Sequence, residues 1–370
     1  GDNALANNTT ASNNTALGRS ALQANTTGAE NTAIGANALD ANTTGSDNTG
    51  VGKNSLSSCT TGNYNTAIGH DALENVTTGS YNNALGRDAG RNITTGASNI
   101  CIGQNSNDAS NTANVVAVGS FAASANTADN IVAIGYYAMR THTSGTQNVA
   151  IGLQSLELST TGTQNTACGA NTLNNCTTGS QNSAFGRRAL LAVTTGDNNT
   201  ASGRDAGFAI TTGDKNTCIG RSAGNTTTTG ENNSSLGFNA QPTSAGAFNQ
   251  VTLGDANISS LRCNVQTISS LSDKRDKTDI VDLPVGLEFI NTLRPVKFKW
   301  KRREPDTNDG NVRAGFIAQD LQLAQTDKEY LDLILDENPE KLEARQGNLI
   351  PVMVQAIKEL SAKVTALEAG

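Results

Sequence analysis

Proline is absent from the first 241 residues of the chain, and all six prolines and the single tryptophan follow that point. Because proline lacks the backbone N–H that a strand ladder needs, its absence is compatible with uninterrupted strand pairing. The net charge is −7 and no basic stripe occurs, so we expect no nucleic-acid partner. No apolar run approaches the roughly 18 residues of a membrane span, which predicts that the chain does not insert into a membrane.

Cysteine and histidine are too sparse and scattered to indicate a disulfide framework or a metal site. The chain has six cysteines and two histidines, and it contains no Cys-x-x-Cys pair. Cys59 and Cys176 share one phase of the sequence repeat but lie seven repeats apart, which is too far for a bridge. His70 and His142 are isolated in the sequence. We therefore expect no metal and no cofactor.

A regular spacing of glycine governs residues 1–254. Twelve of the fourteen steps between these glycines are 17 residues and two are 16. The glycines are Gly18, Gly35, Gly52, Gly69, Gly86, Gly103, Gly119, Gly135, Gly152, Gly169, Gly186, Gly203, Gly220, Gly237 and Gly254. A fixed short period indicates a solenoid in which each repeat packs on its neighbours. We predict a mainly β fold: a parallel β-roll of about fifteen coils, each with two short strands and two turns.

The two residues before the glycine are both non-polar in twelve of the fifteen coils. The nearer one is nearly always large, as in Leu17 and Ile34, and the farther one is small, as in Ala33. Neighbouring strand residues point to opposite faces, so both faces of this strand avoid polar residues. We predict that the large residues fill the interior and that the alanine face packs against another chain, giving an oligomer around an axis. The alternative is that alanine merely tolerates a close-packed turn.

Asparagine recurs four residues before the glycine in twelve of the fifteen coils, from Asn14 to Asn233. Stacked amide side chains hydrogen-bond along such a column in cross-β assemblies. This pattern predicts a structural ladder rather than a ligand site.

Residues 104–147 depart from the common pattern. They lose the Thr-Thr-Gly phrase of the other coils and gain bulky side chains, including Phe121, Tyr136, Tyr137 and Arg140. Aromatic residues and arginine are enriched in recognition surfaces. Two interpretations stay open: local repacking around the two 16-residue coils, or a receptor-contact patch.

The last 99 residues have a different, non-repetitive composition. They hold 15 of the 26 basic and 18 of the 33 acidic residues, and we assign residues 255–271 as a β linker that precedes them. Residues 293–300 alternate like a strand, and residues 315–320 open a helix. A closing helix over residues 348–368 carries apolar residues in heptad-like spacing at Leu349, Met353, Ile357, Leu360, Val364 and Leu367. Such a seam is typical of a short coiled coil.

The order of these motifs resembles the intramolecular chaperone (peptidase S74) domain at the ends of phage tail spikes and fibres. The motifs are Ser-Asp-x-Arg-x-Lys from Ser272, Leu-Arg-Pro from Leu293 with Trp300, Gly-Phe-Ile-Ala-Gln-Asp from Gly315, and the closing helix. The resemblance covers about residues 272–368. It implies a domain that trimerises the chain, guides the β-rich shaft into register, and is then cut off at the Leu271–Ser272 bond.

By the same resemblance, Ser272 is the nucleophile and Lys277 the base of a Ser–Lys dyad, while Asp273 and Arg275 hold the local geometry. A serine hydroxyl needs a base to remove its proton, and a lysine with a lowered pKa can serve. Asp276 departs from the family, which often has an apolar residue there. An acid beside Lys277 favours the charged amine and weakens the base.

The repeats are similar to the head repeats of trimeric autotransporter adhesins, through phrases such as Asn-Val-Ala-Ile-Gly at residues 148–152. That resemblance covers roughly residues 1–254 and implies rolls packed three around an axis, although the family's usual coil is shorter.

These resemblances predict a homotrimeric phage tail fibre or spike with a shaft at 1–254, a linker at 255–271 and a chaperone at 272–370. Its partners would be upstream virion proteins and a host-surface glycan or protein receptor. It would be assembled in the host cytoplasm and carried on the virion. Gly1 lies in phase with Gly18, so we expect more protein upstream.

Two other functions stay open at this point. A bacterial surface adhesin would end in a membrane-anchoring barrel, whereas this chain ends in the heptad helix. A polysaccharide-degrading spike would need paired carboxylates at a groove. The acids Glu30, Asp47, Asp71 and Asp88 are scattered and lack aromatic platforms.

Overall fold

The structure is a computed structural model that describes residues 1–370 except 110, 263, 265–271, 300–310 and 341. Cys263, Leu271 and Trp300 therefore lie outside the described residues, together with much of the expected linker. The chain divides into two units, Gly1–Asp255 and Ala256–Gly370, each of which is described by itself.

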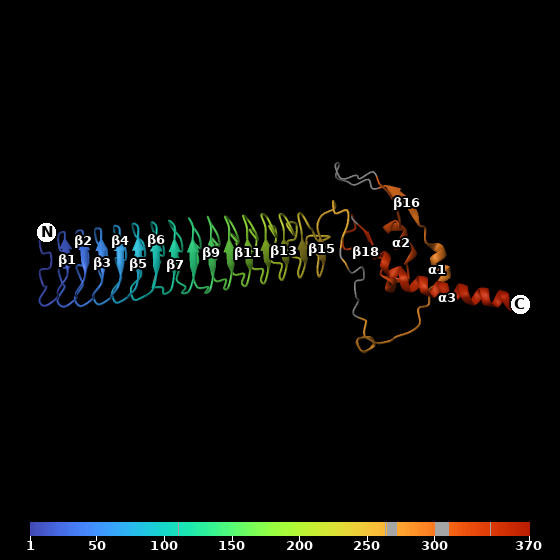
Figure 1. The fold of residues 1–370 in the computed structure, drawn as a ribbon, viewed down its shortest axis with the longest axis horizontal. Coiled ribbons are helices and arrows are strands. Elements are labelled where there is room, and N and C mark those ends of the chain that lie inside the picture. The colour runs from blue at the N-terminus through green and yellow to red at the C-terminus, as the bar shows by residue number, and fades with distance from the viewer. Residues whose placement is uncertain (110, 263, 265–271, 300–310, 341) are drawn as a thin grey trace. The chain divides into compact units, whose positions relative to one another are not determined.

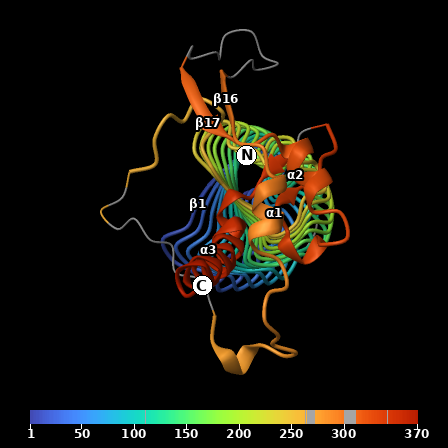
Figure 2. The same cartoon turned by 90° about the vertical axis from the view of Figure 1, so that its right-hand side faces the viewer.

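The first unit is a solenoid built on one fifteen-stranded parallel sheet (Figure 1). The strands are β1 (Thr15–Leu17), β2 (Thr32–Ile34), β3 (Thr49–Val51), β4 (Thr66–Ile68), β5 (Asn83–Leu85), β6 (Ile100–Ile102), β7 (Val116–Val118), β8 (Val132–Ile134), β9 (Val149–Ile151), β10 (Thr166–Cys168), β11 (Ser183–Phe185), β12 (Thr200–Ser202), β13 (Thr217–Ile219), β14 (Ser234–Leu236) and β15 (Val251–Leu253). Each strand pairs with the strand one coil away, and along the stack the coils superpose (Figure 2). The predicted parallel solenoid is confirmed.

The prediction of two strands per coil is wrong, because each coil contributes a single three-residue strand to the sheet. The rest of the coil consists of turns that still bond to the next coil, as where Leu22 N donates to Ala38 O at 3.1 Å. Residues with positive φ interrupt this wall, including Ser20 at 57° and Leu22 at 52°. A backbone with φ near +55° at every second residue is far from the extended conformation, so this wall cannot form a second strand.

The predicted orientation of the strand is also wrong. The central alanines of the strands, such as Ala33 and Ala67, are fully buried, whereas Ile34 and Ile68 are 37% and 41% exposed. The interior is filled from the opposite wall by a column of fully buried leucines, including Leu39, Leu56 and Leu73. A Cβ added at Gly50, on the inward row of β3, would lie 3.5 Å from Leu39 Cδ1. Because leucine already spans the narrow interior, only a small residue fits on the strand.

The repeating glycine is required by the close approach of neighbouring coils. Gly35 has a φ of 138°, and a Cβ there would lie 2.4 Å from the carbonyl oxygen of Gly52. A side chain would therefore be strained by its backbone angle and would clash with the next coil. This contact explains why glycine recurs once per coil.

The predicted asparagine ladder is confirmed. Asn48 is fully buried, and its side-chain amide donates to Gly62 O at 2.8 Å. Its Oδ1 atom accepts from the backbone N–H and the side-chain amide of Asn65, both at 3.0 Å. The ladder is interrupted where Val115 and Ile131 occupy the same position in the irregular coils. Each amide thus satisfies two buried backbone groups of the next coil.

The second unit is a small α/β region. Its elements are η1 (Lys274–Asp276), α1 (Leu287–Thr292), β16 (Val296–Lys299), β17 (Val312–Gly315), α2 (Ala318–Ala324), η2 (Glu329–Leu331), β18 (Ile334–Leu335), β19 (Glu343–Ala344), η3 (Gln346–Asn348) and α3 (Leu349–Glu368). The strands β16 and β17 form one antiparallel hairpin, and β18 and β19 form another. The core gathers one or more residues from α1, α2, β18 and α3, including Phe289, Leu321, Ile334 and Val352.

Helix α3 carries the heptad-like row found in the sequence. Leu349 is buried in the core of the second unit, but Met353, Ile357 and Leu360 are exposed, as are Val364 and Leu367. The helix therefore packs on its own unit through Leu349, Val352 and Ala356 and presents the rest of the heptad-like row outward. Among the described residues, no helix is both long enough and apolar enough to cross a membrane.

The asparagine ladder gives a first prediction. Asn182 donates to Gly196 O at 2.8 Å and accepts from the N–H of Asn199 at 2.9 Å. Asn182→Ala leaves both buried groups unpaired and should lower the free energy of unfolding by about 3 kcal/mol, measured by urea denaturation. The control is Gln181→Ala, which removes an exposed amide that bonds to Gln164. An equal loss in both variants would contradict the ladder's role.

A second prediction concerns His142, which occupies the position of Val76 and Val193 in other coils. Its buried ring contacts Gly145 O through Nε2 and Ser159 Oγ through Nδ1 at 3.2 Å. Burial lowers the pKa of His142 below its usual 6.5, although the Gly145 contact opposes this. The unfolded chain then binds the proton more readily, so stability is full above pH 6.5 and falls as the pH drops through the folded-state pKa.

The measurement is the thermal unfolding midpoint, followed by circular dichroism between pH 7.5 and pH 4.5. Wild type should lose more of its midpoint on acidification than His142→Val, because the variant lacks the buried imidazole. Parallel curves for the two proteins would show that the ring makes no contribution to acid sensitivity.

Candidate active site

The predicted Ser–Lys pair lies on a short turn at the start of the second unit. Asp273 precedes η1, and its side chain accepts from the backbone N–H of Arg275 at 2.9 Å. The Arg275 guanidinium also pairs with the Asp273 carboxylate, with its Nη2 2.5 Å from Oδ2. The Arg275 guanidinium, and then its backbone N–H, lowers the pKa of Asp273. This cap fixes one tight turn of chain between Ser272 and Lys277.

The turn brings the two ends of the motif together. Lys277 N donates to Lys274 O at 3.2 Å, which closes the turn, and Lys277 Nζ lies 2.5 Å from Ser272 Oγ. Both side chains are exposed. Four residues selected from the sequence, Ser272, Asp273, Arg275 and Lys277, therefore form one local cluster.

This arrangement can support proton transfer from a serine hydroxyl. A base must lie within hydrogen-bond reach of the proton that it removes, and Lys277 Nζ meets that distance requirement. Lysine serves as a base only as the neutral amine, which desolvation favours. In the single chain, Lys277 Nζ is close enough to Ser272 Oγ, but both side chains are exposed to water, which favours the charged amine.

Two of the other motifs meet in space. Arg294, from the Leu-Arg-Pro phrase, donates to the Asp320 carboxylate through Nε at 3.0 Å and Nη2 at 2.7 Å. Asp320 closes the Gly-Phe-Ile-Ala-Gln-Asp phrase and lies in the first turn of α2. The ion pair thus ties the segment before β16 to the helix that follows β17. Nothing in the sequence pattern of the two phrases indicates this pairing.

Glu359 is a structural residue that the sequence motifs do not indicate. Its Oε2 atom accepts from the backbone N–H of Leu287 at 2.8 Å, so α3 caps the first turn of α1. A carboxylate is favourable at a helix N-terminus, where N–H groups lack partners. The two residues are 72 positions apart, and no local sequence signal joins them.

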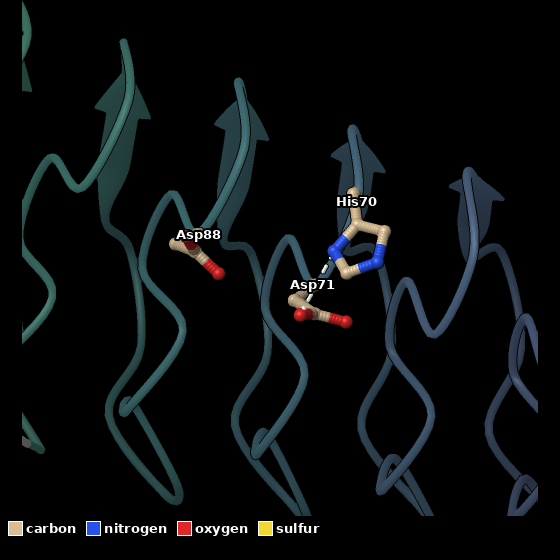
Figure 3. A group of neighbouring side chains, drawn as sticks. All are labelled: His70, Asp71 and Asp88. Carbon is tan, nitrogen blue, oxygen red and sulfur yellow. Dashed lines mark ion pairs between the residues drawn. The ribbon is translucent and has the colours of Figure 1, made fainter.

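A second cluster, on the solenoid, has side chains of the kind that bind metals. His70, Asp71 and Asp88 offer ligand atoms within 4.8 Å of one another, from neighbouring coils (Figure 3). His70 Nδ1 pairs with Asp71 at 2.9 Å, and Arg87 Nε pairs with the buried Asp88 at 2.9 Å. Arg91 lies 3.8 Å from the second oxygen of Asp88. Two guanidinium groups already neutralise this carboxylate, so the cluster is described as an ion-pair network.

The carboxylates considered for glycan cleavage do not form a facing pair. Glu30 and Asp47 occupy the same position in successive coils, in the turn before the strand. Asp71 and Asp88 lie in the turn after the strand and have the partners given above. Each pair follows the repeat rather than flanking a groove.

Part of the second unit matches a known protein family. Residues 272–328 match the family described as the chaperone of endosialidase, peptidase S74, and the match begins at Ser272. The resemblance predicted from the motifs is confirmed over that segment. No curated protein and no solved structure matches the chain. The chaperone domain points to a phage tail fibre or spike type of protein with a β-solenoid.

Proposed function

We propose that this chain, whose residues 272–328 carry a chaperone of endosialidase domain, forms a trimeric tail fibre or spike that attaches a virus to its host. The supporting observation is the combination of a uniform solenoid and a family chaperone segment on one chain. The chaperone end assembles three chains and sets the register of the shaft.

The shaft needs such a device because its coils are nearly alike. Every strand pairs in the same register with the next, so a shift by one coil replaces threonine with threonine and alanine with alanine in many positions. Chains that meet by their shafts alone can therefore associate out of phase. A trimerising end that brings three chains together in phase removes these alternatives.

The exposed row of α3 supports association at that end. Ile357, Leu360 and Val364 repeat at heptad-like spacing on a helix that leaves them uncovered in the single chain. A seam of this length is short for an isolated coiled coil. It suffices beside the other contacts of a trimer.

Self-cleavage is the chemical part of the proposal. The Lys277 amine takes the proton of Ser272 Oγ, which attacks the carbonyl carbon of the preceding residue. The peptide C–N bond breaks, its nitrogen takes a proton and becomes the amine of Ser272, and an ester remains. Water then hydrolyses the ester, which leaves a new carboxyl terminus and restores the serine hydroxyl.

The exposure of the dyad links cleavage to assembly. A lysine amine loses its proton more readily when burial removes it from water. Contacts that cover the turn at Ser272 and Lys277 in the trimer would supply this burial. Cleavage would then follow correct assembly, and the chaperone would be released after its task.

The irregular coils supply the surface for host attachment. Tyr136 and Tyr137 have ring centroids 3.9 Å apart, and Phe121 lies 5.4 Å from Tyr137. The Arg140 guanidinium lies 4.6 Å from the Tyr137 ring centre and also pairs with Glu157. Grouped aromatic rings with a charged rim are features of recognition surfaces.

The cleavage step predicts two fragments of the wild-type chain, residues 1–271 and 272–370, in intact-mass measurements under denaturing conditions. Ser272→Ala and Lys277→Met should each leave a single chain of 38.1 kDa, because one lacks the nucleophile and the other lacks the base. Lys274→Met, in the same turn, is the control and should cleave like wild type. An uncut wild-type chain would leave a permanent trimerisation cap without protease activity.

The assembly step predicts that expression of residues 1–271 alone yields aggregate or mixed species, because no chaperone sets the register. Light scattering after size-exclusion chromatography gives the mass of each species. The full chain carrying Ser272→Ala is the control, since it keeps the chaperone attached. A soluble, well-folded trimer of residues 1–271 would overturn the chaperone role.

A further inference from the structure

The outer face of the fifteen-stranded sheet carries no charge. The first and third residues of every strand point away from the interior, because the central residue points inward. None of these outward residues is Asp, Glu, Lys or Arg, although 26 charged residues precede Ser272. The outward face is therefore neutral over all fifteen coils.

This face combines an apolar row, formed by the third residues of the strands, with a row of first residues that are Thr, Ser or Asn in ten strands and Ile or Val in five. Its third-residue row includes Leu85, Ile102, Ile151 and Leu253, all of which are exposed. Strands about 4.8 Å apart and three residues wide give a strip about 70 Å long and 10 Å wide, or roughly 700 Å². About half of this area is the apolar row, which is interrupted only at Ser202, whereas exposed apolar residues on an ordinary surface are scattered singly.

Charge begins at the edge of the strip. Arg19, Arg87 and Arg204 each directly follow a repeat glycine and are exposed on the turn beside the sheet. An apolar centre with a charged rim is the general arrangement of a protein–protein interface.

The sizes of neighbouring outward residues are matched. Phe185, the largest residue of the third row, pairs with Cys168 on one side and Ser202 on the other. These are the two smallest members of that row. A solvated surface needs no such compensation, whereas a packed surface accommodates a large ring beside small neighbours.

We propose that this outward face is where copies of this chain pack against one another along the shaft, each face contacting the same face of the other copies. The proposal rests on the trimer of the proposed function and specifies its contact surface. Each copy in a trimer shares this strip between two partners, or roughly 350 Å² for each, so the strip adds to the contacts of the exposed α3 row and does not by itself make a standard interface of about 800 Å² per partner. Another copy also offers a strip of the same length and coil spacing, and cyclic symmetry places each level against its own equivalents.

Cys168 provides a native probe of this face. It is half-buried on the outward row, whereas Cys59, Cys101, Cys176 and Cys218 are buried in the interior. Burial raises the pKa of Cys59 to about 11 and those of the other three to about 12, so these thiols react slowly near neutral pH. A Cys263→Ser background removes the remaining cysteine.

The experiment treats the full chain in that background, with Ser272→Ala to keep it intact, with a short bis-maleimide at pH 7. Denaturing gels report covalent dimers, the largest product that a bifunctional reagent can form from one reactive thiol per chain, and light scattering gives the native mass. The matched control carries Cys168→Ser and Leu158→Cys, which moves the thiol to an exposed turn position outside the sheet. Equivalent Cys168 thiols held together should cross-link at least about tenfold more than the control, because their effective concentration is high.

Each outcome is decisive. An oligomer that cross-links through Cys168 and not through residue 158 supports the proposed face. An oligomer that cross-links through residue 158, or through neither position, overturns the face but leaves the trimer of the proposed function standing. A monomeric native mass overturns the proposed trimer and the interface together.

Discussion

The close backbone contact between successive coils is the constraint on which the solenoid depends. At Gly35 the next coil is so near that a Cβ would lie 2.4 Å from the Gly52 carbonyl oxygen. Neighbouring coils held this closely can exchange backbone hydrogen bonds all round, even where turns replace a strand. The interior is then only wide enough for one large side chain, which Leu39 supplies, and the facing strand position must be alanine or similarly small.

The sequence predicted the period, the parallel stacking and the asparagine ladder, because each follows from a repeated residue at a fixed spacing. The direction of the strand could not be predicted in the same way. Both of its faces avoid charge, so the alternation of Ala33 and Ile34 does not say which one points inward. The deciding residue is Leu39, on the opposite wall. Its positive φ and full burial depend on a turn conformation that no local pattern indicates.

In the second unit, too, contacts between residues close in the sequence could be predicted and contacts between distant residues could not. The Ser272–Lys277 contact forms within one capped turn, so a short motif was enough to select its residues. The contacts that position the rest of the unit join Arg294 to Asp320 and Glu359 to Leu287. Those pairs are 26 and 72 residues apart, and only the folded chain brings them together.

Residues that depart from the repeat can fix the register between chains when the other coils are equivalent. In a uniform stack, a slip by one coil would exchange like residues and cost little. In the proposed interface a slip would set Phe185 opposite Cys168 or Ser202 of another copy and no longer opposite its own equivalent, so side-chain volumes that match in register would be mismatched. It would also misalign the 16-residue coils, in which Val115 and Ile131 replace the ladder asparagines. In the proposed trimer these irregular positions would therefore distinguish the correct register from its neighbours, and a chaperone end would need only to bring the chains close to it.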